Sequence, residues 1–189
     1  MIPYIGDISK NDAELLAGLA ASATNILEFG VGASTQVMAQ YKMGTMISLE
    51  TDPAWIDKTR KNLIRLGIPN DAVDFRPYEG FPVDPSERFD LIFDDGVDRY
   101  RREFALKAWP LLSVGGTFCF HDTRRTGDVL NVCALLGAIS AEVLLVKFNE
   151  NHSNITTIVK KQAEHFEDWN VIEKRAAWQT GWGEPPEGK

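Results

Sequence analysis

Residues Asn25 to Gln36 read NILEFGVGASTQ, and this stretch decides the fold that the sequence predicts. A short apolar run leads into two glycines and then into a segment of helical composition. Gly30 and Gly32 permit backbone angles and close approaches that a side chain would forbid. Glu28 stands between two apolar residues, where burying a carboxylate is costly unless something binds it. We therefore expect a strand, then a turn at which a ligand meets bare backbone, then a helix.

The alternation of strand and helix continues along the chain. Apolar runs predict strands at 25–30, 45–50, 72–78, 89–96, 115–122, 141–149 and 154–161. Helical spacing predicts helices at 12–22, 33–41, 53–67, 99–109 and 126–140. Only the residues ENHS separate the last two strands, which suits a tight antiparallel hairpin and leaves no room for a helix. The predicted class is α/β: a doubly wound, Rossmann-like sheet of seven strands with an antiparallel final hairpin.

Composition limits the partners that we expect. The 189 residues fit one domain, 1–189, in which 162–189 form a C-terminal tail after the last strand. A net charge of −7 argues against nucleic acid as a partner. The arginines gather in two groups that could hold an anionic small molecule: Arg99, Arg101 and Arg102, then Arg124 and Arg125.

The sequence also predicts where the protein works. No apolar run approaches the roughly 20 residues that cross a bilayer, so we expect no membrane partner. The first residues, MIPYIGDISKND, lack the basic flank and apolar stretch of a secretory signal. Two cysteines, at positions 119 and 133, are typical of packing thiols in a reducing compartment. These features predict a cytoplasmic protein.

The tail contains three of the five tryptophans, Trp169, Trp178 and Trp182. Large aromatic side chains are enriched at interfaces. Two interpretations stay open. The tail packs on its own domain as a final helix, or it covers an acceptor pocket or joins a second subunit, which would make a homodimer.

Two acids beside the glycine turn distinguish between nucleotide ligands. Glu50 ends the second expected strand, about 20 residues after the glycines, where a carboxylate can accept both ribose hydroxyls. Thr35 stands where a dinucleotide-binding turn has its third glycine, and Glu28 would repel a pyrophosphate. Beside an ammonium group the same carboxylate would help. The pattern favours S-adenosylmethionine (SAM) over NAD.

Further acids follow the fourth and fifth strands. Asp95 and Asp122, with His121 beside them, can hold Mg²⁺ or another divalent cation. Such an ion would lower the pKa of an acceptor hydroxyl. His121 could instead act as a general base or pair with backbone. In the reading without a metal, Asp95 contacts the cofactor and Asp122 caps the next helix.

Several motifs together resemble class I SAM-dependent methyltransferases over residues 12–161. They are LEFGVGAST, ISLETD, FDLIFDDG, LLSVGGTFCFHDT and the final hairpin. Within that superfamily, the Asp-Gly pair after the fourth strand and the His-Asp pair after the fifth are similar to small-molecule O-methyltransferases, including metal-dependent ones. The resemblance implies methyl transfer from SAM to a small-molecule acceptor, at a hydroxyl group.

The resemblance also assigns roles to the residues that match its motifs. Glu28 would hold the methionine amine, and the backbone of Gly30 and Gly32 would pass close to the cofactor. Ser34 would lie near the methionine carboxylate. The remaining cofactor contacts would be Glu50 to the ribose, Thr51 and Glu79 to the adenine, and Asp95 on the cofactor side.

Three other functions stay open. The chain could be a SAM-binding module without turnover, or an aminopropyl transferase, which shares the sheet but uses a decarboxylated cofactor. An NAD-dependent reductase is disfavoured by Glu28 and Thr35.

Overall fold

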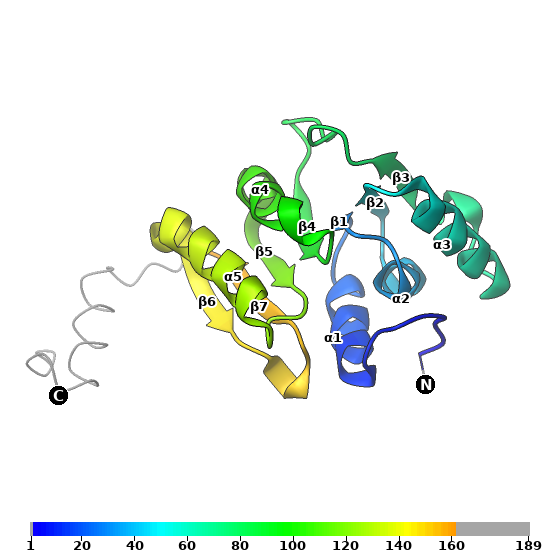
Figure 1. Ribbon diagram of the computed structural model, residues 1–189, viewed down its shortest axis with the longest axis horizontal. Helices are drawn as coiled ribbons and strands as arrows, with labels where there is room; N and C mark the ends of the chain where they lie inside the picture. The colour runs from blue at the N-terminus through cyan, green and yellow to red at the C-terminus, as the bar shows by residue number, and fades with distance from the viewer. Residues whose placement is uncertain (1, 162–189) are drawn as a thin grey trace, which may run out of the picture.

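A computed structural model describes residues 2–161 (Figure 1). The seven strands are β1 Asn25–Phe29, β2 Thr45–Glu50, β3 Asp74–Pro77, β4 Phe89–Asp94, β5 Leu112–Phe120, β6 Val143–Lys147 and β7 Thr156–Lys160. The helices are α1 Lys10–Ala20, α2 Ala33–Tyr41, α3 Pro53–Arg65, α4 Asp98–Ala108 and α5 Thr126–Ile139. The tail at 162–189, for which the sequence left two interpretations open, lies outside the described residues.

All seven strands form one sheet in the order β3-β2-β1-β4-β5-β7-β6. The first five strands pair in parallel, and β7 pairs antiparallel with both β5 and β6. The predicted doubly wound sheet with its antiparallel hairpin is therefore confirmed. The strand order reverses between β1 and β4, and such a switch point is where ligands bind in sheets of this kind.

Two apolar cores cover the two faces of the sheet. Alternate residues of a strand point to opposite faces, so β1 contributes to both cores. Leu27 and Phe29 pack in the cluster that holds the buried residues of α4 and α5. Ile26 packs in the cluster that holds those of α1, α2 and α3. Figure 1 shows these two groups of helices on opposite sides of the sheet. Glu28 shares the face of Ile26 and thus faces α2.

Several element boundaries differ from the predictions. The first helix begins at Lys10 because Ser9 caps it, its Oγ accepting a hydrogen bond from the backbone N–H of Asp12. The strand expected at 72–78 covers only 74–77, because Asn70–Ala72 form a 3₁₀ turn. The hairpin connection is not tight, since the 3₁₀ turn Glu150–His152 lies between β6 and β7.

Both cysteines are free thiols, but only Cys119 is buried; Cys133 is exposed on α5, so its expected packing role is wrong. Within residues 2–161, no helix is both long and apolar enough to cross a membrane.

Candidate functional site

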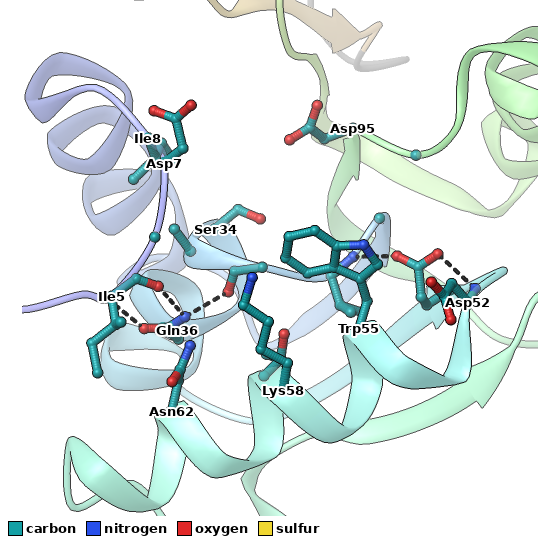
Figure 2. A pocket seen from close by; sticks show the side chains of 18 of the residues that line it. Ile5, Asp7, Ile8, Ser34, Gln36, Asp52, Trp55, Lys58, Asn62 and Asp95 are labelled. Atoms are coloured by element: carbon teal, nitrogen blue, oxygen red, sulfur yellow. Dashed lines mark hydrogen bonds between the residues drawn. The ribbon is translucent and has the colours of Figure 1, made fainter.

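A cavity of about 810 Å³ lies at the carboxyl ends of β1, β2 and β4 (Figure 2). Its walls are the N-terminal segment 5–8, the glycine turn 30–34, the end of β2 with the first turns of α3, and the turn 95–97. The volume falls within the roughly 300–1,000 Å³ that small-molecule sites occupy. The cavity therefore occupies the switch point of the sheet and is large enough for a nucleoside-sized ligand.

The glycine turn brings bare backbone to the cavity wall. Gly30 has φ +90°, and a Cβ atom placed on it would lie 2.3 Å from the carbonyl oxygen of Asp95. Its N–H donates to the carbonyl of Leu49 at 2.9 Å. Gly32 also lines the cavity, where the chain enters α2. At Gly30 the close neighbour is the turn after β4, and the approach of the Gly30 and Gly32 backbone to a cofactor stays a prediction.

Glu28 is fully buried behind the glycine turn and does not line the cavity. Three hydroxyl groups donate to its carboxylate: Ser34 at 2.6 Å, Thr35 at 2.7 Å and Ser48 at 2.6 Å. Burial raises the pKa of Glu28 to about 7, although the three hydrogen bonds oppose this rise. The carboxylate that the sequence assigned to a ligand is therefore bound by its own chain, and direct contact with an amine stays a prediction.

Glu50 lies at the cavity wall, with its carboxylate held by backbone amides. Val31 N–H donates to Oε2 at 3.1 Å, and the N–H groups of Thr51 and Asp52 donate to Oε1 at 2.6 and 3.0 Å. These bonds hold the side chain between the glycine turn and the start of α3. The carboxylate is oriented before any ligand arrives.

One face of α3 lines the cavity, and the sequence analysis missed it. Trp55, Lys58, Thr59 and Asn62 follow one another at helical spacing. The Lys58 ammonium lies 3.9 Å from the centroid of the Trp55 ring, within cation–π distance. The sequence contained a signal for this wall: polar residues recur at helical spacing on α3, the helix that follows the strand ending at Glu50.

The N-terminal segment closes another side of the cavity. Gln36 of α2 donates to the carbonyl of Ile5 at 2.9 Å and accepts from its N–H at 2.8 Å. Gln40 donates to the carbonyl of Pro3 at 2.8 Å. Two glutamines one turn apart thus fix the segment onto α2, and Asp7 and Ile8 reach the cavity (Figure 2).

Asp95, His121 and Asp122 come together as predicted, each offering one ligand atom within 4.8 Å of the others. His121 Nδ1 lies 3.1 Å from Asp95 Oδ1 and 3.5 Å from Asp122 Oδ1. Of the three, Asp95 lines the cavity. The cluster therefore adjoins the cavity through Asp95.

Asp12, which the sequence analysis missed, completes the surroundings of His121. It is fully buried in the first turn of α1, and its Oδ2 lies 3.4 Å from His121 Nε2. Its Oδ1 accepts the backbone N–H of Asn154 at 2.6 Å. Asp12 thus links the N-terminal helix, the end of β5 and the entry to β7.

These contacts change the protonation of both partners. Burial alone would lower the pKa of His121, but hydrogen bonds with Asp12 and Asp95 and the charges of Asp95 and Asp122 raise it to about 10. Burial would raise the pKa of Asp12, but hydrogen bonds from His121, Ser9 and Asn154 lower it to about 2. Without a metal, His121 is an imidazolium at neutral pH and has no free lone pair for general-base catalysis.

The sequence grouped Arg101 with neighbouring arginines that could hold an anionic small molecule, but Arg101 is buried. It is 1% exposed and donates to Asp95 Oδ1 at 2.7 Å and to the carbonyl of Gly96 at 3.0 Å. It also pairs with Asp128. The role of Arg101 as a contact for an anionic ligand is therefore wrong; it holds the turn after β4 in place.

The other predicted residues divide into two groups. Ser34 and Thr51 line the cavity, and Thr51 Oγ1 donates to Glu50 at 3.0 Å. Glu79 is exposed and does not line it. The adenine contact expected of Glu79 stays a prediction without a place in the cavity wall.

Comparisons with known proteins found similarity at the level of structure. No model of a known protein family matches the chain, and no curated protein sequence matches it. The O-methyltransferase from Bacillus cereus, solved in complex with SAH, is 23% identical at a TM-score of 0.66, and the match covers 84% of each chain. TomG from Streptomyces achromogenes, an O-methyltransferase involved in tomaymycin synthesis and solved with SAM, is 16% identical at a TM-score of 0.66, over 82% of each chain.

A third similar structure is a SAM-dependent O-methyltransferase from Thermotoga maritima. It is 16% identical at a TM-score of 0.67, and the match covers 87% of this chain and 69% of the other. The chain has the fold of these O-methyltransferases, so the resemblance found in the sequence is confirmed for the fold.

Proposed function

We propose that the protein transfers the methyl group of SAM to a hydroxyl group of a small-molecule acceptor. The observation that carries this proposal is the cavity at the switch point, which combines the bare backbone of Gly30 with the oriented carboxylate of Glu50 and ends at Asp95. The similar proteins from Bacillus cereus and Streptomyces achromogenes were solved with SAH and SAM. In the proposal, Glu50 accepts the ribose hydroxyls and the glycine turn supports the rest of the cofactor.

Methyl transfer from a sulfonium needs little chemical help beyond position, because the sulfur is already a good leaving group. Holding two reactants in line can replace much of the catalysis that other reactions need. In the proposal, Asp95 faces the acceptor from the cavity wall and orients its hydroxyl proton. Arg101 and His121 fix Asp95 for this task through bonds to the same Oδ1 atom.

The cluster of Asp95, His121 and Asp122 also suits a divalent cation. Two carboxylates and one imidazole are a common donor set for such ions. A histidine that binds a metal usually donates its other N–H to a carboxylate, and Asp12 faces Nε2 of His121 in that way. Asp95, Asp122 and the imidazole of His121 would hold such an ion. A bound ion would supply a lower pKa for the acceptor hydroxyl.

Thermal denaturation with four ligands tests the proposed function. A ligand that binds only the folded state stabilises it by about 2.7 kcal/mol at a hundred times its dissociation constant. We expect SAM and SAH to raise the melting temperature and NADH to leave it unchanged; 5′-methylthioadenosine should give a smaller rise. Mass spectrometry of SAM incubations with a panel of phenols and alcohols then identifies the acceptor. Absence of any rise with both SAM and SAH would refute the proposal.

Four expectations about location, partners and domain organisation accompany the proposal. We propose a cytoplasmic protein without a nucleic-acid partner. We also propose that residues 1–189 form one domain and that its tail takes part in a homodimer. Light scattering on the full chain and on a chain ending at residue 176 tests the last point, since a monomer in both cases contradicts it.

A further inference from the structure

One end of the cavity holds polar groups that lack partners. Thr59 is 1% exposed and Asn62 is 6% exposed, yet both line the cavity. Within residues 2–161 neither side chain forms a hydrogen bond. Their polar atoms are not among the fully buried ones without a partner, so they remain accessible. Buried polar groups normally find partners. A hydroxyl and an amide left open toward a cavity therefore point to a ligand.

The charge at this end is positive, unlike the rest of the wall. Of the described residues that line the cavity, Lys58 alone carries a positive charge, whereas four carboxylates line the remainder: Asp7, Glu50, Asp52 and Asp95. Within the same part of the chain, the Lys58 ammonium lies over the Trp55 ring and forms no ion pair. Figure 2 shows Lys58 and Asn62 on one side of the cavity and Asp7 and Asp95 on the other.

The cofactor's amino-acid part has one charge of each sign, and the site must hold both. Ser34 was the residue that the sequence assigned to the carboxylate. Its hydroxyl hydrogen, however, is directed to Glu28 at 2.6 Å, and that of Thr35 is directed to the same carboxylate. Neither hydroxyl is free to donate to a second anion. The carboxylate needs other donors, and the first turn of α2 offers backbone amides alone.

We propose that Lys58, together with Thr59 and Asn62, binds the α-carboxylate of the cofactor, and that Asp7 faces its ammonium. The inference rests on the proposed function and extends it. Lys58 supplies the charge, and the Asn62 amide and the Thr59 hydroxyl supply two further donors. The site thereby selects SAM over its decarboxylated form. It also separates methyl transfer from aminopropyl transfer, which uses that form.

Calorimetric titration with two ligands tests this inference. SAH has the amino-acid part, and 5′-methylthioadenosine has the same adenosine and sulfur without it. Replacing Lys58→Met should weaken SAH binding about tenfold, the loss of one charge-assisted contact, and leave 5′-methylthioadenosine unchanged. Lys58→Arg should restore most of the SAH affinity. Lys61→Met, on the same helix, exposed and outside the cavity wall, is the matched control and should change neither.

The outcomes separate the two proposals. Unchanged SAH affinity in Lys58→Met would overturn the assignment, as would an equal loss for both ligands. Equal affinity of the unmodified protein for both ligands would also overturn it, because the carboxylate would then contribute nothing. If the unmodified protein binds neither ligand, the proposed function itself fails. Melting curves without ligand verify that each variant is folded.

Discussion

His121 Nε2 lies 3.4 Å from Oδ2 of Asp12, so the first helix and the end of the fifth strand meet through one ion pair. Both groups are buried, and each changes the protonation of the other. The folded protein binds the His121 proton more tightly than the unfolded chain does. The resulting stability is fully present below pH 6.5 and is lost as the pH rises through about 10. Asp12 contributes stability above its ordinary pKa of 3.8, which is lost as the pH falls through about 2.

Replacing Asp12→Asn should therefore lower the pKa of His121 and reduce stability near neutral pH by about 1–3 kcal/mol. Urea unfolding in EDTA, measured from pH 6.5 to about 10, gives the slope for the metal-free protein. We expect a shallower fall in the variant than in the unmodified chain. Proton NMR of the His121 ring reads the pKa directly. An unchanged His121 pKa in the variant would contradict the ion pair.

Glu28→Gln tests the buried carboxylate. The folded pKa of Glu28 is about 7, above its ordinary 4.5, so its favourable contribution is present below pH 4.5 and lost as the pH rises through 7. Glutamine does not titrate. The stability of the variant relative to the unmodified protein should thus rise across this interval, by on the order of 1–3 kcal/mol. Chemical denaturation at both ends of the interval measures the difference.

The same variant also tests how Glu28 serves the cofactor. If Glu28 acts by positioning Ser34 and Thr35, then Glu28→Gln should leave SAH affinity nearly unchanged. A direct contact with the amine would cost about tenfold or more. A loss of that size would restore the direct contact that the sequence suggested.

Glu50→Ala should weaken SAH binding about ten- to a hundredfold, because the ribose hydroxyls lose a charged acceptor. The backbone amides of Val31 and Asp52 also lose their partner, so the glycine turn becomes less ordered. Glu50→Gln keeps one oxygen and should give an intermediate loss. Calorimetry measures both variants, and circular dichroism verifies the fold. The same dissociation constant in all three proteins would remove Glu50 from the ribose site.

Local signals allowed most of the fold to be predicted. The glycine turn, Glu50 at the tip of β2 and the acids after β4 each follow an apolar strand, and parallel strands bring their carboxyl ends to one edge. Boundaries were less accurate where a cap or a 3₁₀ turn decides them. Ser9 began α1 earlier than the apolar spacing suggested.

The rest of the site depends on contacts that no local pattern encodes. Asp12 reaches His121 only because α1 packs beside the end of β5, and Gln36 bonds Ile5 only because the N-terminal segment folds back. The sequence suggested that Glu28 binds a ligand directly. Its three hydroxyl partners come from α2 and β2, and no pattern around Glu28 in the sequence reveals them. Arg101 looked like a contact for an anionic ligand, but it is buried and bonds to three segments: the turn after β4, the end of β5 and α5. Tertiary pairing of polar groups decides all four cases.

Chelation tests the proposed cation site. If one ion is held by Asp95, His121 and Asp122, EDTA should abolish most methyl transfer, and Mg²⁺ or Mn²⁺ should restore it. Asp122→Asn should weaken metal binding, measured by titration with Mn²⁺ in electron paramagnetic resonance. Asp57→Asn, an exposed acid on α3 outside the cavity wall, is the control and should behave as the unmodified protein. Full activity after exhaustive chelation would leave the cluster as an ion-pair network that positions Asp95.

The last prediction concerns Gly30, whose backbone lies against the turn after β4. A methyl group there would lie 2.3 Å from the Asp95 carbonyl oxygen, and φ +90° disfavours any L side chain. Gly30→Ala should destabilise the fold by more than about 1–2 kcal/mol and displace the turn that presents Asp95. Gly18→Ala is the matched control: Gly18 lies within α1 with open space around it, so alanine should stabilise by about 0.5–1 kcal/mol. Urea denaturation of both variants gives the two values. Equal stabilities would mean that β1 and the turn after β4 do not approach as closely as the site requires, and the arrangement of Glu50 and Asp95 around one cofactor would fail with them.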